Sequence, residues 1–250
     1  MNNDTILEIQ DLDFWYGEQH ILDGVSFSVR TGEIMVIIGG SGSGKTTVLK
    51  NIIGLNKPNS GSIRLLGNEM TLIEEEDLET VLQDVGVMYQ NGALLNSMNI
   101  GENVALPLEM HTNMSPELRK AVAELKLFQV ELAGAYNKYP RELSGGMKKR
   151  AAVARAIVMD PKIIFCDEPS AGLDPITTRE LDKLLINLKE NLNMTIVVVS
   201  HEIESVKRIA DRITYIEKGK VLYTGALKDA LDQKIPAIQN FFLETNNTID

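Results

Sequence analysis

Residues 34–47, IMVIIGGSGSGKTT, indicate the fold more clearly than any other part of the chain. The first five residues form an uninterrupted apolar run, which favours a strand buried on both faces of a parallel sheet. The remainder matches the pattern G-x-x-x-x-G-K-[ST], whose glycines let backbone amides wrap around phosphate groups. Residues 45–55 have helical spacing. A buried strand, a glycine loop and a helix in this order predict a nucleotide-binding loop rather than a tight turn with an exposed lysine.

Each residue of this loop has an expected role. The amine of Lys45 is expected to reach the β- and γ-phosphates, and the hydroxyl of Thr46 is placed to ligate Mg²⁺. The N-terminus of the following helix adds positive potential. The predicted phosphate-binding residues are Gly39, Gly40, Ser41, Gly42, Ser43, Gly44, Lys45, Thr46 and Thr47.

Two further apolar runs, IIFC at 163–166 and TIVVV at 195–199, also predict buried parallel strands. All three runs end abruptly in polar or glycine residues. In open α/β sheets, ligands bind beyond the carboxyl ends of the strands, so the three ends predict one shared site.

The polar residues at these ends suggest hydrolytic chemistry. Asp167 is expected to hold Mg²⁺ through its water shell, and Glu168 to orient and deprotonate an attacking water. A carboxylate pair that caps a turn before Pro169 is the alternative. His201 is able to hydrogen-bond a γ-phosphate and so to distinguish ATP from ADP, although a lone histidine is more often structural.

Composition restricts the partners of the chain. Its 250 residues carry a net charge of −10, so the surface is expected to repel nucleic acid and anionic lipid headgroups. The single cysteine, Cys166, excludes an internal disulfide and fits a reducing compartment. The N-terminus does not resemble a signal peptide, and no apolar run approaches the roughly 18 residues of a membrane span. We expect another chain to supply any span.

The flanks are predicted to contain strands and short helices. The alternating segments 5–16 and 19–30 are expected to be exposed strands, and 212–225 a hairpin that turns at Lys218 and Gly219. Helices are expected at 179–193, 202–212, 226–233 and 235–244, and a frayed tail at 246–250.

The middle of the chain, from about 91 to 159, has no buried-strand pattern. Residues 114–130 have helical spacing, with Ser115 as the cap before Pro116. We therefore expect a helical insertion in the α/β core.

A second glycine loop, LSGGMKKR at Leu143–Arg150, lies within this middle part. Ser144 is able to cap the helix that follows, so that the positive end of the helix faces an anion. An ordinary capped helix with Lys148, Lys149 and Arg150 in solvent is the alternative, but it does not explain the two glycines.

Together these motifs resemble the ATP-binding subunits of ABC transporters over nearly the whole chain. LSGG matches the signature loop of that family and precedes IIFCDEP by the usual interval. The resemblance implies a single ABC ATPase domain over 1–250, an α/β P-loop NTPase with a RecA-like parallel-sheet core and an N-terminal antiparallel β subdomain. It implies a core of 1–90 and 160–235, an inserted helical subdomain at about 91–159, and a C-terminal helix and tail at 236–250.

The resemblance also implies further site residues. Gln90 in MYQNGA corresponds to the Q-loop glutamine, which joins Glu168 and His201 in catalysis and Thr46 and Asp167 at the metal. Tyr16 in FWYG corresponds to an aromatic residue that stacks on adenine, although by chemistry alone it could pack inward from a strand. AGLD at 171–174 corresponds to the D-loop.

In this family two subunits associate head to tail, and each signature loop completes the nucleotide site of the other. The resemblance therefore implies a homodimer with ATP and Mg²⁺ at its interface. Ser144, Gly145 and Gly146 would contact the γ-phosphate that is bound by the partner's Lys45. The second loop would thus serve the ATP of a neighbour.

Two departures from the family pattern refine the resemblance. Gly40 stands where many relatives have proline, alanine or serine, and Met147 where most have glutamine. LSGGMKKR and residues 89–108 resemble the ATPases of Mce-type lipid transporters, the MlaF-like group. This implies phospholipid or lipid cargo, an MlaE-like permease, an Mce-domain protein, and peripheral attachment at the cytoplasmic face of the inner membrane.

In relatives, the permease inserts a helix near Gln90. The apolar side chains that would suit this docking are Ala93, Leu94, Leu95 and Met98, for which core packing is the alternative.

Three other functions stay open at this point. One is an ABC importer or exporter for amino acids, metals or lipoproteins, against which Met147 argues. Another is a soluble ABC ATPase, of which a metallocluster-assembly factor fits better than DNA-repair or translation proteins, because the chain lacks coiled-coil insertions and a second cassette. A nucleotide-binding regulator without turnover fits poorly with an intact Glu168 and His201.

Overall fold

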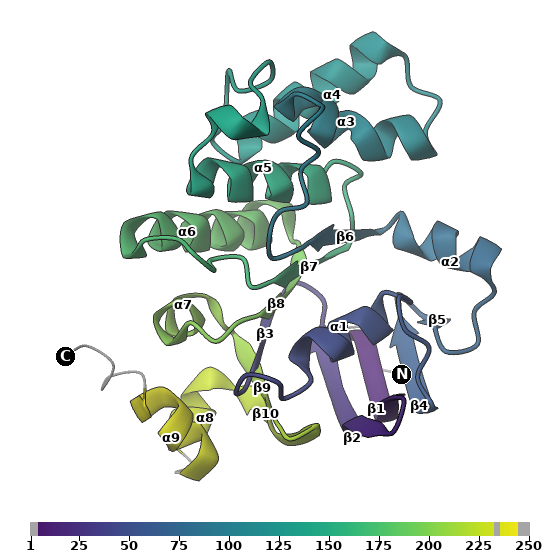
Figure 1. Ribbon diagram of the computed structural model, residues 1–250, viewed down its shortest axis with the longest axis vertical. Helices are drawn as coiled ribbons and strands as arrows, with labels where there is room; N and C mark the ends of the chain where they lie inside the picture. Colours follow the sequence, from purple (N-terminus) through teal and green to yellow (C-terminus); the bar gives the residue numbers. More distant parts are fainter. Residues whose placement is uncertain (1–4, 233–235, 245–250) are drawn as a thin grey trace.

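The computed structural model describes residues 5–232 and 236–244. At its centre lies a six-stranded sheet in the order β10-β9-β3-β8-β7-β6 (Figure 1). All neighbouring strands in it are parallel except β9 and β10. The strands are β3 (Ile34–Ile38), β6 (Val85–Met88), β7 (Ile163–Asp167), β8 (Thr195–Val199), β9 (Arg212–Glu217) and β10 (Lys220–Ala226).

The three buried parallel strands predicted from apolar runs are confirmed as β3, β7 and β8. Their register pairs Val199 of β8 with both Ile37 of β3 and Asp167 of β7. The segments that follow these strands therefore begin at one edge of the sheet.

Strand β6 was missed because its sequence, VGVM, is short and contains a glycine. A Cβ atom on Gly86 would lie 2.3 Å from the carbonyl oxygen of Ala156 at the end of α5 (Gly145–Ala156). Close packing of this helix on the strand thus requires glycine at a position where buried strands usually carry a β-branched residue.

The two faces of the central sheet contribute to two different hydrophobic cores. Val36, Cys166 and Val198 face the core formed with α3–α7, whereas Ile37 and Val197 face the core shared with α1 and the antiparallel sheet. Figure 1 shows α3, α4 and α5 gathered on one side of the sheet, with α1 and the antiparallel strands on the other. Burial on both faces explains the continuous apolar runs.

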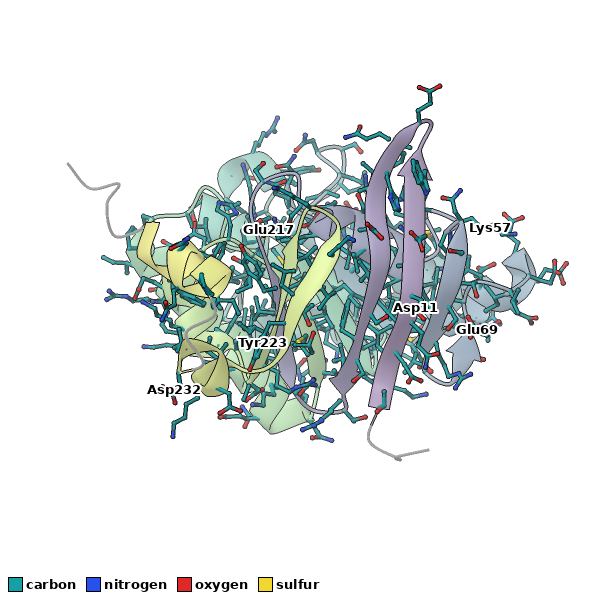
Figure 2. All side chains as sticks on the ribbon, turned by 90° about the horizontal axis from the view of Figure 1, so that it is seen from below. Asp11, Lys57, Glu69, Glu217, Tyr223 and Asp232 are labelled. Carbon is teal, nitrogen blue, oxygen red and sulfur yellow. The ribbon has the colours of Figure 1, made fainter. Side chains whose placement is uncertain are left out.

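The antiparallel sheet has the order β2-β1-β4-β5. Figure 2 marks it with Asp11 and Glu69, beside the β9–β10 hairpin that carries Glu217 and Tyr223. Its strands are β1 (Thr5–Tyr16), β2 (Gln19–Arg30), β4 (Ser60–Leu65) and β5 (Asn68–Glu69). The prediction that β1 and β2 are exposed is wrong for one face: Leu7 and Val25, for example, are fully buried in the second core.

Helices lie at all five predicted flanking positions: α1 (Lys45–Ile52), α6 (Pro175–Leu192), α7 (Ile203–Ile209), α8 (Leu227–Asp232) and α9 (Pro236–Glu244). Helix α2 (Glu75–Leu82) forms where the sequence predicts none. Helix α6 begins four residues before the prediction, because the side chain of Asp174 accepts hydrogen bonds from the amides of Ile176 and Thr177. The hairpin turn is confirmed at Lys218 and Gly219, both with positive φ.

The regular elements between residues 91 and 159 are all helical: α3 (Ile100–His111), α4 (Pro116–Gln129), the 3₁₀ turn Pro140–Glu142 and α5. The cap at Ser115 is confirmed, since its hydroxyl accepts from the amide of Leu118 at 3.3 Å. Buried Asn103 of α3 donates to the carbonyls of Leu95, Met98 and Asn99 and so shapes the segment that enters the helix.

Within the described ranges, no helix is long and apolar enough to cross a membrane. The predicted tail at 246–250 lies outside the described residues.

Cys166 provides a test of the buried sheet. Burial raises the pKa of its thiol from 9.0 to about 12, so the group is neutral in the native chain. We expect no alkylation by iodoacetamide at pH 8 under native conditions and rapid alkylation in urea, measured by mass spectrometry. Because the folded pKa is the higher one, ionisation of this thiol favours unfolding as the pH rises above about 9. Alkylation at equal rates in both conditions would contradict the buried position of β7.

Candidate nucleotide-binding site

A cavity of about 730 Å³ lies at the carboxyl ends of the central strands. The structure brings together here all nine predicted residues of the first loop with Gln90, Glu168 and His201. Residues that the sequence did not indicate also line it, namely Gln19 and Ile21 of β2 and Phe241 of α9. The predicted residues in its lining are Gly39, Gly40, Ser41, Gly42, Ser43, Gly44, Lys45, Thr46, Thr47, Gln90, Glu168 and His201.

The first glycine loop is fixed by close backbone packing. Gly39 has φ +152°, and a Cβ atom there would lie 2.0 Å from the carbonyl oxygen of Ile216 in β9. Gly44 has φ +104°, and its Cβ would lie 2.7 Å from the side chain of Leu22 in β2. Only glycine fits at either place, so the loop is anchored at both ends by strands of both sheets.

Lys45 occupies the centre of this loop. Its side chain is buried, and Nζ donates to the carbonyl oxygens of Gly39 at 2.9 Å and Gly40 at 2.8 Å. Burial lowers its pKa, and the carboxylates of Glu168 and Asp167 oppose that change. Ser43 Oγ is buried without a hydrogen-bond partner among the described residues. A loop of amides with a buried ammonium and an unsatisfied hydroxyl fits an anionic phosphate.

Thr46 and Asp167 form an oxygen pair beside the loop. Thr46 Oγ1 donates to Asp167 Oδ1 at 3.3 Å, which joins the start of α1 to the end of β7. Burial raises the pKa of Asp167, whereas the hydrogen bond from Thr46 lowers it. Oxygen ligands of this type suit Mg²⁺ together with phosphate oxygens, so these residues fit the predicted metal.

Glu168 and His201 form the second pair. Glu168 Oε1 accepts from His201 Nδ1 at 2.8 Å, while Glu168 Oε2 is buried without a hydrogen-bond partner in the described part of the chain. The Glu168 side chain is 12% exposed and that of His201 is 61% exposed. Glu168 also has φ +47°, a strained conformation for this residue type that the surrounding structure must maintain.

The signature loop, residues 143–146, is not brought to this cavity. None of Ser144, Gly145 and Gly146 is among the described residues that line it. The hydroxyl of Ser144 caps α5 by accepting from the amide of Met147 at 3.3 Å, and Ser144 and Gly145 are exposed. Gly146 is buried against Thr177, so close that a Cβ atom would lie 2.3 Å from its Cγ2 atom.

Tyr16 lies outside the lining, near the end of β1. The residue is 47% exposed, so the alternative of inward packing is wrong. The ring meets Phe14 edge to face at a centroid distance of 4.7 Å, and the hydroxyl accepts from Asn56 Nδ2 at 3.0 Å. An exposed and oriented ring close in sequence to Gln19 and Ile21 of the cavity remains available for stacking.

The predicted docking residues divide into two sets. Ala93 and Leu95 are exposed, whereas Leu94 packs partly against the core and Met98 is half-buried. A second cavity of about 450 Å³ lies between α2, β6, α3 and α5, with Leu78, Pro107 and Arg155 among its lining.

The alternative that placed all three basic residues of LSGGMKKR in solvent is wrong for two of them. Lys148 is exposed, but Lys149 and Arg150 are buried. Arg150 pairs with Glu131 and with Glu180. Helical spacing after a loop does not by itself distinguish an exposed lysine from a buried one, so the burial of Lys149 and Arg150 could not be predicted from the sequence.

Gly39 and Gly40 form a matched pair for testing the loop. A Cβ atom at Gly39 meets backbone at 2.0 Å, whereas one at Gly40 meets nothing within 4 Å. We expect Gly39→Ala to abolish nucleotide binding and to lower the free energy of unfolding by about 1–3 kcal/mol. Gly40→Ala should retain both, as measured by ATP titration and urea unfolding. Equal behaviour of the two variants would contradict the packing of the loop on β9.

Known sequences similar to this chain are ATP-binding proteins, in agreement with the nucleotide site. The ABC transporter family model matches residues 22–171. The chain is 39% identical over 227 residues to the methionine import ATP-binding protein MetN of Clostridium tetani, covering 90% of this chain and 70% of that protein. It is 37% identical over 236 residues to the probable ribonucleotide transport ATP-binding protein mkl of Mycobacterium bovis, covering 94% of this chain and 66% of that protein.

Solved structures agree as well. The dimeric ATP-binding cassette MJ0796, in a post-hydrolysis state bound to ADP and Pi, superposes with a TM-score of 0.80 at 32% identity, over 88% of this chain and 98% of that chain. The cbiO1 protein of Clostridium perfringens, part of the ABC transporter complex cbiONQ, gives a TM-score of 0.85 at 27% identity, over 98% of both chains. The chain therefore belongs to the ABC transporter family, as an ATP-binding subunit that hydrolyses ATP.

Proposed function

We propose that Glu168 is the general base of ATP hydrolysis in this chain and that His201 holds it in place. The observation that carries this proposal is the asymmetry of the carboxylate: one oxygen accepts from His201, and the other is buried without a hydrogen-bond partner among the described residues. Glu168 lines the cavity, and its unpaired carboxylate oxygen suits the acceptance of a proton from a water that binds there.

The other site residues divide the remaining work. Lys45 exchanges its two loop carbonyls for phosphate oxygens and balances their charge. Thr46 and Asp167 would hold Mg²⁺, with Gln90 as the third residue toward it, and the ion would add positive charge beside the phosphates. Exposed Tyr16 would stack on the adenine ring. None of these roles requires the chain to supply a positively charged surface.

We also propose that two copies of the chain share their nucleotides head to tail. The signature residues Ser144 and Gly145 are exposed and lie outside the cavity of their own chain, at the positive end of α5. The positive end of α5 would stabilise a phosphate that is bound by a second copy of the chain. The dimeric MJ0796 cassette supports this arrangement, since a dimer is the form found for that relative.

Replacing Glu168 by glutamine tests the catalytic role. Glutamine keeps the size of the side chain but is a poor proton acceptor, so we expect ATP hydrolysis to fall by at least about 10²-fold while ATP binding persists. Phosphate release and ATP titration measure the two quantities. Because the nucleotide is no longer consumed, the variant should also elute as a dimer in ATP. Turnover at the wild-type rate would show that another group is the base.

For transport, we propose that the chain works at the cytoplasmic face of the inner membrane through a separate permease. The exposed residues Ala93 and Leu95 lie close in sequence to Gln90, and the cavity between α2, β6, α3 and α5 offers an apolar recess nearby in which a permease helix would dock. In this arrangement, α3–α5 would act as an inserted helical subdomain. Docking there would connect the permease to the Q-loop glutamine in the nucleotide cavity.

We propose phospholipid or a related lipid as the cargo, with an MlaE-like permease and an Mce-domain protein as partners. Support comes from LSGGMKKR and the stretch at 89–108, which resemble the MlaF-like group. The 39% identity to MetN favours a second candidate, amino-acid import.

Purification of the Glu168→Gln variant from membranes in mild detergent with ATP distinguishes these cargoes. We expect mass spectrometry to find an MlaE-like permease, an Mce-domain protein and bound phospholipid. A methionine-type permease would support the second candidate and overturn the lipid assignment. Soluble partners alone would favour a role outside transport.

A further inference from the structure

Lys149 joins three parts of the molecule that contribute to the nucleotide site. It lies on α5, one turn after the signature loop, and only 7% of it is exposed. Its Nζ atom donates to the carbonyl oxygen of Gln90 at 2.5 Å and to that of Glu168 at 3.2 Å. One ammonium group therefore holds the main chain of both the Q-loop glutamine and the proposed base.

The same face of α5 holds the rest of the Q-loop segment. Arg155 donates to the carbonyl oxygens of Gly92 at 2.6 Å and Ala93 at 2.7 Å. Between the two cations, Gly92 lies against Ala152, whose Cβ atom would be 3.3 Å from a Cβ on the glycine. Spacing of three residues along α5 places these contacts on one side of the helix. Residues 90–93 are thus fastened to α5 at both ends.

The contact with Glu168 acts on a strained residue. Glu168 has φ +47°, and its amide donates to the carbonyl oxygen of Val199 at 2.9 Å, while its own carbonyl oxygen accepts from Lys149. A left-handed main chain at glutamate persists only when its surroundings determine it. Lys149 and β8 therefore fix the peptide groups on either side of this residue, and with them the direction of its carboxylate.

Charge strengthens this arrangement. Burial lowers the pKa of Lys149, and the nearby Glu168 carboxylate opposes that change. Hydrogen bonds from an ammonium to a carbonyl are stronger than those from a neutral donor, such as the amide of Ala171, which also donates to the carbonyl oxygen of Glu168 at 3.2 Å.

We propose that Lys149 is a positioning residue for ATP hydrolysis: it ties the main chain of Glu168 and of Gln90 to the helix that begins at the signature loop. This inference rests on the proposed role of Glu168. It adds a connection within one chain, because a shift of α5 when Ser144 and Gly145 meet a phosphate of the second copy moves the anchor of this chain's own base. The state of one nucleotide site is thereby passed to the other.

Three variants of the full chain test the proposal. Lys149→Met removes the donor, Lys149→Gln keeps a shorter neutral donor, and Lys148→Met changes the exposed neighbour on the same helix as a matched control. For Lys149→Met we expect kcat to fall by about 10- to 100-fold, with the dissociation constant for ATP unchanged within about twofold. Lys149→Gln should fall in between, and Lys148→Met should match the wild type.

Cooperativity provides a second readout that a purely structural role would not change. Two connected sites predict a sigmoidal dependence of turnover on ATP concentration in the wild type. If Lys149 makes the connection, Lys149→Met should lose this sigmoidal shape and Lys148→Met should keep it. A wild-type kcat and curve shape in Lys149→Met would overturn the proposal, as would equal losses of ATP affinity and of kcat.

Two controls keep the result interpretable. If Lys149→Met does not fold, as judged by thermal unfolding, the kcat and ATP affinity of Lys149→Gln decide by the same criteria. Failure of the proposed base is recognised separately, because Glu168→Gln would then retain turnover whatever the Lys149 variants do.

Discussion

The structure depends on one electrostatic constraint: a chain with a net charge of −10 must bind a polyanion. Long-range attraction is not available, so the binding groups have to be close, oriented and partly dry. The glycine loop meets this need through backbone amides, the start of α1 and the buried ammonium of Lys45. The loop keeps its shape because Gly39 packs on β9 and Gly44 on β2. Both sheets therefore contribute to one phosphate site.

A second constraint follows from what one chain lacks. Glu168, His201 and the loop meet in one cavity, but the signature residues do not reach it. Helix α5 contributes to the site in two ways: its exposed start is free to meet a second copy, and its buried side holds the Q-loop segment and Glu168 through Lys149 and Arg155. A single helix would thus sense a neighbour's nucleotide and position its own chain's base, which suits a machine that closes and opens as a dimer.

Local patterns predicted much of this architecture. Uninterrupted apolar runs predicted β3, β7 and β8, because strands buried on both faces consist of apolar residues throughout. The polar residues at their ends predicted the site, because parallel strands end at the same edge of the sheet. Contacts between segments that are distant in the sequence produce no comparable pattern. Strand β6 contains a glycine, Gly86, because α5 packs closely against it, and this glycine interrupts the apolar pattern that would have predicted the strand. The partners of Lys149 are main-chain carbonyls, which any residue type supplies. Phe241 joined the cavity through tertiary packing alone.

Complementation between two inactive variants shows whether each signature loop completes the site of a second copy. Lys45→Ala disables the phosphate loop, and Gly145→Asp places a carboxylate at the signature loop. Each variant alone should lack turnover. In a 1:1 mixture, half of the dimers carry one intact site, so activity should return to about a quarter of the wild-type rate. A mixture as inactive as its components, with mixed dimers verified by native mass spectrometry, would show that the signature loop does not act across the dimer.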